Sequence, residues 1–361
     1  MYRKLLIAFV SLFLFTNLSA QVDNDFSVIA YYTGNDKQID QFEVTKLSHI
    51  IFSFCHLEDG ELHVDNAKDS TTIKYLVSLK KRHPKLKIML SLGGWGGCAP
   101  CSEAFSTAAG RTKFARSVKK VNDYFQTDGI DLDWEYPTIE GHPGHLYQAQ
   151  DKQNFTALIQ ELRQTLGTHE LSFAAGGFQK YLDESVEWEK IMPLVDRVNI
   201  MSYDLVNGYA TVTGHHTPVF STDSKEESTD RAVQFLLRKG IPAHKLVIGA
   251  AFYTRVWENV NDVNNGLYQA GKHRSGYDFK SYETNLTTQN GWVYFWDKKA
   301  QASYWYNKKQ RLFATGDDLS SVRAKTNYAL NHKLGGIMFW ELTLDTFKDG
   351  MLDAINGLVK Q

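Results

Sequence analysis

Residues 128–137 read DGIDLDWEYP, a run in which acidic side chains recur at every second position. Successive side chains of a β-strand point to opposite faces, so Asp131, Asp133 and Glu135 share one face, and the apolar residues between them share the other. In a barrel of parallel strands the apolar face contacts the surrounding helices and the acidic face lines the barrel axis. Glu135 comes last, and we therefore expect it nearest the carboxyl-terminal mouth of the barrel.

Short apolar runs with β-forming residues recur on both sides of this strand, and helical patterns separate them. The eight candidate strands are residues 28–32, 49–54, 87–92, 129–134, 171–175, 198–203, 246–252 and 335–340. Apolar residues at helical spacing predict helices over residues 114–125, 155–166, 228–239 and 320–333. This alternation predicts an α/β fold, a (β/α)8 TIM barrel. An open doubly wound sheet is the alternative, but no glycine-rich phosphate turn follows the first strand.

One connection is too long for a single barrel helix. Some sixty residues rich in Tyr, Trp, Asn and Gly separate Trp257 from Ser320, whereas a barrel connection needs only a few residues and one helix. We expect residues 258–316 to form a small α+β insertion between strand 7 and helix 7, within a barrel domain of residues 21–361. Because this connection follows strand 7, the insertion would form one wall of a cleft at the carboxyl-terminal face.

The first 20 residues have a basic start at Arg3 and Lys4, an apolar run of 11 residues and a small residue at Ala20. This pattern predicts a signal peptide with cleavage near Ala20, and therefore a secreted or periplasmic protein. A membrane anchor is the alternative, but 11 residues are too short to span a bilayer about 30 Å thick. We expect no membrane association after cleavage.

The chain has three cysteines. Cys98 and Cys101 are spaced to close a small loop, and in an exported protein we interpret them as a disulfide. A redox pair or half of a metal site are the other interpretations, although no second Cys or His pair has the matching spacing. Cys55 lies in an apolar run and is expected to be a buried thiol.

The overall composition limits the classes of partner. The 361 residues include 40 basic and 41 acidic side chains, a net charge of −1, so a nucleic-acid partner is not expected. Aromatic residues make up 13% of the chain, which suits stacking against a flat ligand. We expect a monomer that uses neither a metal nor another cofactor.

The acidic face of residues 128–137 indicates acid–base chemistry. Three carboxylates crowded on one buried strand cannot all ionise cheaply, so at least one should hold a proton near neutral pH. A protonated carboxyl group beside an ionised one is suited to general acid catalysis. The alternatives are a salt-bridged strand on a solvated sheet, for which no basic partners are interleaved, and a divalent metal site, for which no Asp-rich loop is present.

Other predicted strand ends would surround these acids with aromatic and hydroxyl groups. Strand 3 ends in SLGGW, where Ser91 and Gly94 precede an aromatic surface at Trp95. Met201 and Tyr203 share a face at the end of strand 6. Further rings come from strands 1 and 8, at Tyr31 and Trp340. A polar floor with aromatic walls is a typical arrangement for holding sugar rings.

These motifs resemble those of glycoside hydrolase family 18, the retaining chitinases. DGIDLDWEYP matches the DxxDxDxE motif of that family, and SLGGW, MSYD and GGIMFWEL resemble its motifs on strands 3, 6 and 8. The segment after FYTR resembles the chitinase insertion. The resemblance extends in order along the whole mature chain. It implies hydrolysis of β-1,4 bonds between N-acetylglucosamine units of chitin or chitooligosaccharides.

The resemblance also implies roles for individual residues in a substrate-assisted mechanism. Glu135 would protonate the glycosidic oxygen, and the 2-acetamido oxygen of the substrate would attack the anomeric carbon in place of the enzyme nucleophile of other retaining glycosidases. Asp133 would hold the acetamido N–H, Asp131 would tune the proton of Asp133, and Tyr203 would donate to the acetamido oxygen. The remaining residues of the expected sugar site are Tyr31, Ser91, Gly94, Trp95, Tyr136, Met201, Asp204, Arg255 and Trp340; of these, Tyr31 and Ser91 would support the acids from below.

Two departures from the family pattern and two other functions are relevant. Thr254 stands where the family often has Gly before the arginine, which weakens the assignment of Arg255, and the loop closed by Cys98 and Cys101 is not a general family feature. An endo-β-N-acetylglucosaminidase acting on N-glycan cores is one alternative function. A chitin-binding lectin is another, but lectins of this kind usually lack the acid that Glu135 provides.

Overall fold

The computed structural model describes residues 26–224 and 226–360, and the predicted signal peptide at residues 1–20 lies outside them. Eight parallel strands close into a barrel, since β1 pairs with both β2 and β14. In chain order they are β1 (Ser27–Tyr32), β2 (His49–Glu58), β4 (Lys87–Gly93), β5 (Gly129–Asp133), β6 (Glu170–Gly176), β7 (Arg197–Met201), β8 (Leu246–Ala251) and β14 (Gly336–Trp340). The predicted strands and the TIM barrel are confirmed.

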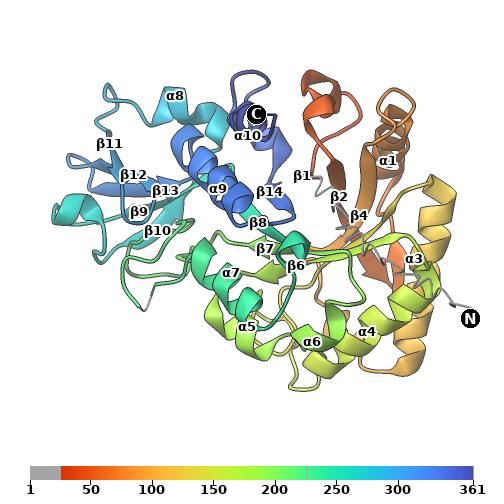
Figure 1. The fold of residues 1–361 in the computed structure, drawn as a ribbon. Helices are drawn as coiled ribbons and strands as arrows, with labels where there is room; N and C mark the ends of the chain where they lie inside the picture. Colours follow the sequence, from red (N-terminus) through yellow and green to blue (C-terminus); the bar gives the residue numbers. More distant parts are fainter. Residues whose placement is uncertain (1–25, 225, 361) are drawn as a thin grey trace, which may run out of the picture.

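Helices cover the outside of the barrel (Figure 1). The longer ones are α1 (Ala67–Leu79), α3 (Ala108–Phe125), α4 (Asp151–Leu166), α7 (Thr229–Arg238), α9 (Leu319–Asn331) and α10 (Met351–Val359); shorter ones are α2 (Cys101–Ala104), α5 (Gln179–Glu184) and α6 (Trp188–Ile191). The four predicted helices correspond to α3, α4, α7 and α9. The side chain of Ser228 caps α7 by accepting the N–H of Arg231.

Two layers of buried side chains fill the barrel domain. The apolar face of β5, with Ile130 and Leu132, packs in the large core between strands and helices. A second cluster fills the barrel axis and includes Met89, Met201 and Met338. The side chains that alternate along β5 therefore separate into a helix-facing apolar set and an axis-facing acidic set.

The segment between β8 and α9 forms a second, antiparallel sheet. Its strands are β9 (Thr254–Glu258), β10 (Lys272–Ser275), β11 (Val293–Asp297), β12 (Ala302–Asn307) and β13 (Leu312–Gly316), in the spatial order β10-β9-β13-β12-β11, with the short helix α8 (Tyr282–Asn285). Figure 1 shows this sheet standing to one side of the barrel. An α+β insertion after strand 7 of the barrel is thus confirmed.

The sequence did not predict the hairpin at the end of β2. Strand β2 continues to Glu58 and turns back through β3 (Glu61–His63), with which it pairs antiparallel. Over residues 26–224 and 226–360, none of the helices has both the length and the apolar character needed to cross a membrane.

Candidate active site

The three acids of β5 lie at increasing height along the barrel axis. Asp131 is fully buried, Asp133 is 4% exposed and Glu135, two residues beyond Asp133, is only partly buried. Each carboxyl group thus has a different environment, although the three residues occupy equivalent positions in the alternation. The differences decide which of them can do chemistry.

Asp131 is saturated with hydrogen-bond donors. One carboxylate oxygen accepts from the Tyr31 hydroxyl at 2.9 Å and from Ser91 at 3.2 Å, and the other accepts from Ser172 at 2.6 Å and Asn199 at 3.1 Å. Burial raises the pKa of Asp131, and these four donors oppose that shift. Hydrogen bonds from four donors favour the ionised carboxylate, so we infer that Asp131 is the ionised member of the group.

Two of these donors, Ser172 on β6 and Asn199 on β7, were missed by the sequence reasoning. Ser172 stands directly opposite Asp131 in the parallel register of β5 and β6, and each of the two is a polar residue inside an otherwise apolar run. That polarity was the available signal. Tyr31 and Ser91 lie beneath the mouth, fully buried, with their hydroxyl groups on Asp131.

Asp133 lacks such partners. Its Oδ1 atom is buried and has no hydrogen-bond partner among the described residues. Burial, then the neighbouring carboxyl groups of Glu135 and Asp131, raise the pKa of Asp133 well above its usual range. An orphaned buried acceptor is costly, so this position suits either a proton or an N–H group supplied by a ligand.

Glu135 is poised to titrate near neutral pH. Burial raises the pKa of Glu135 to about 7, a hydrogen bond with Tyr136 opposes this shift, and the negative charge of Asp204 adds to it. A carboxyl group with that pKa holds a proton in a large fraction of molecules at neutral pH. Glu135 therefore has the protonation behaviour of a general acid at the open end of the acidic row.

The aromatic floor depends on a glycine. The Trp340 ring stacks on Phe54 at 5.4 Å between centroids and lies 5.9 Å from the ring of Tyr31. Gly94 has φ +77°, and a Cβ atom there would approach the Phe54 ring to 2.3 Å. The N–H of Gly94 also donates to the carbonyl of Asp133 at 2.9 Å. The SLGGW turn therefore has to bring its backbone against both the floor and the acidic strand.

Trp95 stands at the rim with much of its ring free. It is 48% exposed and contacts the rings of Tyr136, His142 and Tyr209, with the Tyr209 centroid 6.4 Å away. Tyr209, in the long connection between β7 and α7, is 64% exposed and was not predicted from the sequence. The two exposed rings offer flat apolar surfaces to a ligand.

A charged network adjoins the acids on the side of the insertion. Arg255 donates from Nε and Nη2 to the two carboxylate oxygens of Asp204, each at 2.7 Å, and the Tyr253 hydroxyl donates to Asp204 at 2.8 Å. Although burial opposes it, the guanidinium of Arg255 holds the pKa of Asp204 well below its usual range. The guanidinium expected to bind sugar hydroxyls is thus engaged with Asp204 in this structure, and Tyr253 and His216 join the site without having been predicted.

The remaining predicted residues lie in the barrel axis or on the rim. Tyr203 and Met201, each 9% exposed, belong to the axial cluster, and the Tyr203 hydroxyl lies 3.9 Å from the sulfur of Met338. Thioether sulfur is a weak acceptor, so this hydroxyl group can donate to a better one. Tyr136 packs its ring against Phe178 at 5.5 Å.

Cys98 and Cys101 are joined by a disulfide in the loop that follows Trp95, and Cys55 is a buried free thiol. Within the part of the chain that the structure describes, no group of three or more His, Cys, Asp or Glu residues is arranged to hold a metal ion.

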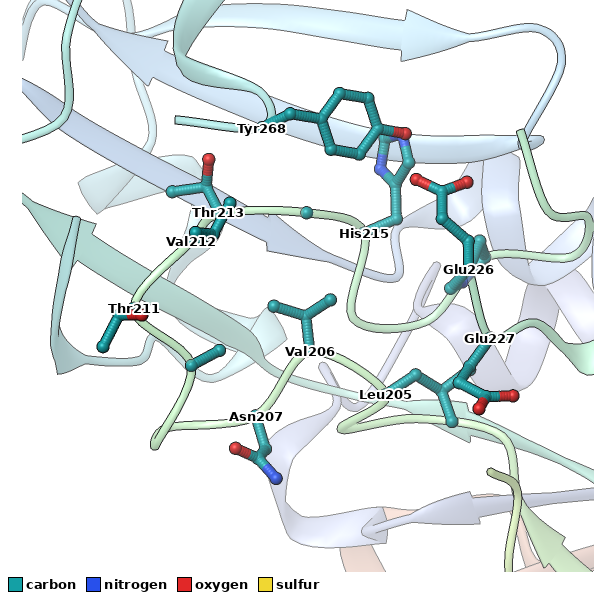
Figure 2. Close-up of a pocket in the computed structure, with 13 residues that line it drawn as sticks. Leu205, Val206, Asn207, Thr211, Val212, Thr213, His215, Glu226, Glu227 and Tyr268 are labelled. Atoms are coloured by element: carbon teal, nitrogen blue, oxygen red, sulfur yellow. The ribbon is translucent and has the colours of Figure 1, made fainter. Parts of the chain in front are cut away.

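A separate pocket opens beside the long β7–α7 connection (Figure 2). Its lining includes Val206, His215, Glu226 and Tyr268 and none of the acids of β5. In Figure 2 the His215 ring lies behind Tyr268, close to the strands of the second sheet. This pocket is therefore not the acidic site, but it shows that the connection has one side toward the insertion.

Comparison with known proteins gives one consistent result. Residues 27–345 match the sequence model for "Glycosyl hydrolases family 18". Chitinase A1 of Niallia circulans is 34% identical over 76% of this chain and 43% of its own length, and chitinase B of Serratia marcescens is 27% identical over 98% and 83%. The chain thus spans less than half of the Niallia protein. A solved family 18 N-acetylglucosaminidase from Paenibacillus barengoltzii is 34% identical, with TM-score 0.84 and coverage of 92% and 99%.

Proposed function

This chain belongs to the glycosyl hydrolases of family 18, and we propose that it is a chitinase that cleaves β-1,4 bonds between N-acetylglucosamine units with retention of anomeric configuration. The observation that carries the proposal is the pair formed by Glu135 and Asp133. One carboxyl group has a pKa of about 7 at the open end of the row, and the other presents a buried oxygen without a partner among the described residues. An acid and an acceptor for N–H are the two groups that substrate assistance requires.

Bond cleavage begins with proton transfer from Glu135 to the glycosidic oxygen. The acetamido oxygen of the same sugar attacks the anomeric carbon as the leaving group departs, which forms a cyclic oxazolinium ion. Asp133 accepts the acetamido N–H on its Oδ1 atom and balances the positive charge. Glu135, now ionised, removes a proton from a water molecule, and the water attacks the anomeric carbon from the face opposite the acetamido oxygen. This attack opens the oxazolinium ring, so the two inversions at the anomeric carbon give net retention.

The surrounding residues orient the sugar for this attack. The Tyr203 hydroxyl donates to the acetamido oxygen, and the Trp340 ring supports the sugar from below. Asp131 lies beneath Asp133 and tunes the proton of that carboxyl group. Trp95 and Tyr209 provide exposed rings for the neighbouring sugars. We also propose that the protein is exported, on the strength of the leader pattern in residues 1–20.

A second candidate is the release of single N-acetylglucosamine units. It is favoured by the Paenibacillus structure described as an N-acetylglucosaminidase, which matches 92% of this chain. Both candidates use the same acids and differ only in product length.

The test is hydrolysis of N-acetylglucosamine hexasaccharide, followed by product size and by the anomeric form of the first products. We expect β-anomers, as dimers and trimers for a chitinase or as monomers for the second candidate. Initial α-anomers would contradict the retaining mechanism. Binding of the hexasaccharide without cleavage would contradict hydrolysis and indicate a lectin.

A further inference from the structure

A buried histidine, His216, follows the pocket residue His215 and contacts Asp204. His216 is fully buried, and its Nδ1 atom accepts the backbone N–H of Asp204 at 3.2 Å and lies 3.4 Å from the Asp204 carboxylate. Its Nε2 atom has no hydrogen-bond partner among the described residues. In a neutral ring that accepts through Nδ1, the proton belongs to Nε2. The contact to the Asp204 backbone is therefore the main polar contact of this ring.

Asp204, which His216 contacts, has an unusual backbone conformation. Asp204 follows Tyr203 at the end of β7 and has φ +54°, in the left-handed region. Arg255 and Tyr253 hold its carboxylate, but neither contacts its N–H. The His216 ring also packs against Tyr253, 5.4 Å away at 40°. His216 thus supports both the backbone of Asp204 and one of the two residues that hold its carboxylate.

The preceding residue, His215, points away from Asp204 and toward the second sheet. Its Nε2 atom lies 3.0 Å from Asp297 of the second sheet, and its ring contacts Tyr268 and Tyr304 (Figure 2). The two adjacent histidines therefore attach the same connection to two different regions. His215 fastens it to the insertion, and His216 fastens it to the acidic site. His215 is consequently a matched control for His216.

We propose that His216 is a positioning residue for the reaction, because its Nδ1 atom fixes the backbone of Asp204 and so fixes the negative charge that faces Glu135. The inference rests on the proposed function, since Glu135 is the acid of that reaction. His216 itself would touch neither substrate nor reacting atoms. Loss of its acceptor should let the Asp204 charge move away from Glu135 and ease the ionisation of that acid.

Other charged and titratable groups face the same two carboxylates and remain unchanged in the test. Electrostatic interactions connect Asp204 or Glu135 with Tyr136 and Asp133 of β5 and its end, Tyr181 of α5, Tyr203 after β7, Tyr253 and Arg255 at β9, and His273 of β10. Because these groups are common to every variant compared, a change seen only in the His216 variants is assigned to His216.

The experiment measures kcat/KM against pH on the hexasaccharide for wild type, His216→Leu, His216→Asn and His215→Asn. We expect His216→Leu to lower kcat/KM about tenfold, the factor typical of one lost hydrogen bond, and to move the alkaline limb to lower pH. The Asn side chain can still accept the Asp204 N–H, so the alkaline limb of the pH profile in His216→Asn should lie at the same pH as in wild type. His215→Asn should lower thermal stability and leave the limb in place.

Three results would overturn the inference: an unmoved limb in His216→Leu, a limb in His216→Asn that matches the Leu variant, or an equal displacement in His215→Asn. His216→Ala replaces the Leu variant if the latter does not fold. Inactive wild-type enzyme would instead contradict the proposed function. In that case the pKa of Glu135 is measured without activity, from the change that Glu135→Gln makes in the pH dependence of Tm. Equal pKa values in the wild-type and His216→Leu backgrounds would contradict the inference.

Discussion

The base and the mouth of the barrel each hold a buried aspartate, and the two aspartates differ in how many hydrogen bonds the protein gives them. At the base, Asp131 accepts four hydrogen bonds from side chains of four strands. At the mouth, Asp133 is two residues further along the same strand and keeps one buried oxygen without a partner among the described residues. Two aspartates on one strand thus differ in their hydrogen bonding. Asp131 bonds to four groups of the protein, whereas Asp133 keeps an oxygen free to bond to a ligand.

This difference in hydrogen bonding distinguishes a carboxylate that supports the structure from one that can bind a ligand. A saturated carboxylate gains nothing from a ligand, whereas an unsaturated buried one gains the hydrogen bond that folding did not supply. Glu135 completes the series, because it is the least enclosed of the three and has a pKa of about 7. The three acids therefore form a series, from a carboxylate with four donors at the base to a carboxyl group with a pKa of about 7 at the opening.

The largest effect should come from the acid at the mouth. Glu135→Gln removes the transferable proton while keeping the shape of the side chain, so we expect kcat on the hexasaccharide to fall about 10³-fold. Binding measured by calorimetry should change little. Glu140→Gln, an exposed residue beyond the same strand, is the matched control and should keep normal kcat. A Glu135→Gln variant with near-normal kcat would refute the assignment of the acid.

The next effect should come from Asp133→Asn. Asn cannot balance the positive charge of the oxazolinium ion, so we expect kcat to fall about 10²-fold, with a smaller change in KM and in Tm. Steady-state kinetics with the hexasaccharide measure both constants. An unchanged kcat would show that Asp133 has no role in the reaction and would contradict the substrate-assisted mechanism.

Asp131→Asn should instead act on stability. The amide nitrogen would face donors that now bond to a carboxylate, and a buried mismatch of this kind costs about 1–3 kcal/mol. Urea unfolding measures the loss. Asp123→Asn breaks only an exposed i,i+4 ion pair with Lys119 and should cost less than about 0.5 kcal/mol. A stability loss in Asp131→Asn no larger than that in Asp123→Asn would contradict the role of Asp131 as a hydrogen-bonded support.

The smallest effect is the pH dependence of stability. Folding raises the pKa of Glu135 from an ordinary value near 4.5 to about 7, so the unfolded chain ionises first as pH rises. The stability associated with its proton is complete below about pH 4.5 and is lost as pH approaches 7. We expect the stability of wild type relative to Glu135→Gln to fall across this window by about 1–2 kcal/mol. A flat difference between pH 4.5 and 7 would mean that Glu135 has an ordinary pKa.

Much of the fold and of the acidic row could be predicted from the sequence, because both depend on local patterns. The barrel strands are short apolar runs, and alternation alone puts Asp131, Asp133 and Glu135 on one face. Ser172 and Asn199 were missed because a single polar residue inside an apolar strand gains meaning only from the register that brings it to Asp131.

The rest depended on long connections. Tyr209 and His216 lie in the segment between β7 and α7, where no periodic pattern predicts which side chains turn toward the barrel. Arg255 was predicted as a sugar contact, and its bidentate bond with Asp204 required the position of β9 beside the mouth. Contacts of this type are set by tertiary packing, and sequence spacing carries no record of them.

The most direct measurement compares hexasaccharides of N-acetylglucosamine and of glucosamine at equal concentration, with binding of each measured on Glu135→Gln. If the acetamido oxygen is the nucleophile and Asp133 holds its N–H, the acetylated substrate is cleaved and the glucosamine substrate is not cleaved even when it is bound. Comparable rates of cleavage for the two bound substrates would contradict substrate assistance, and with it the role given to the unpartnered oxygen of Asp133.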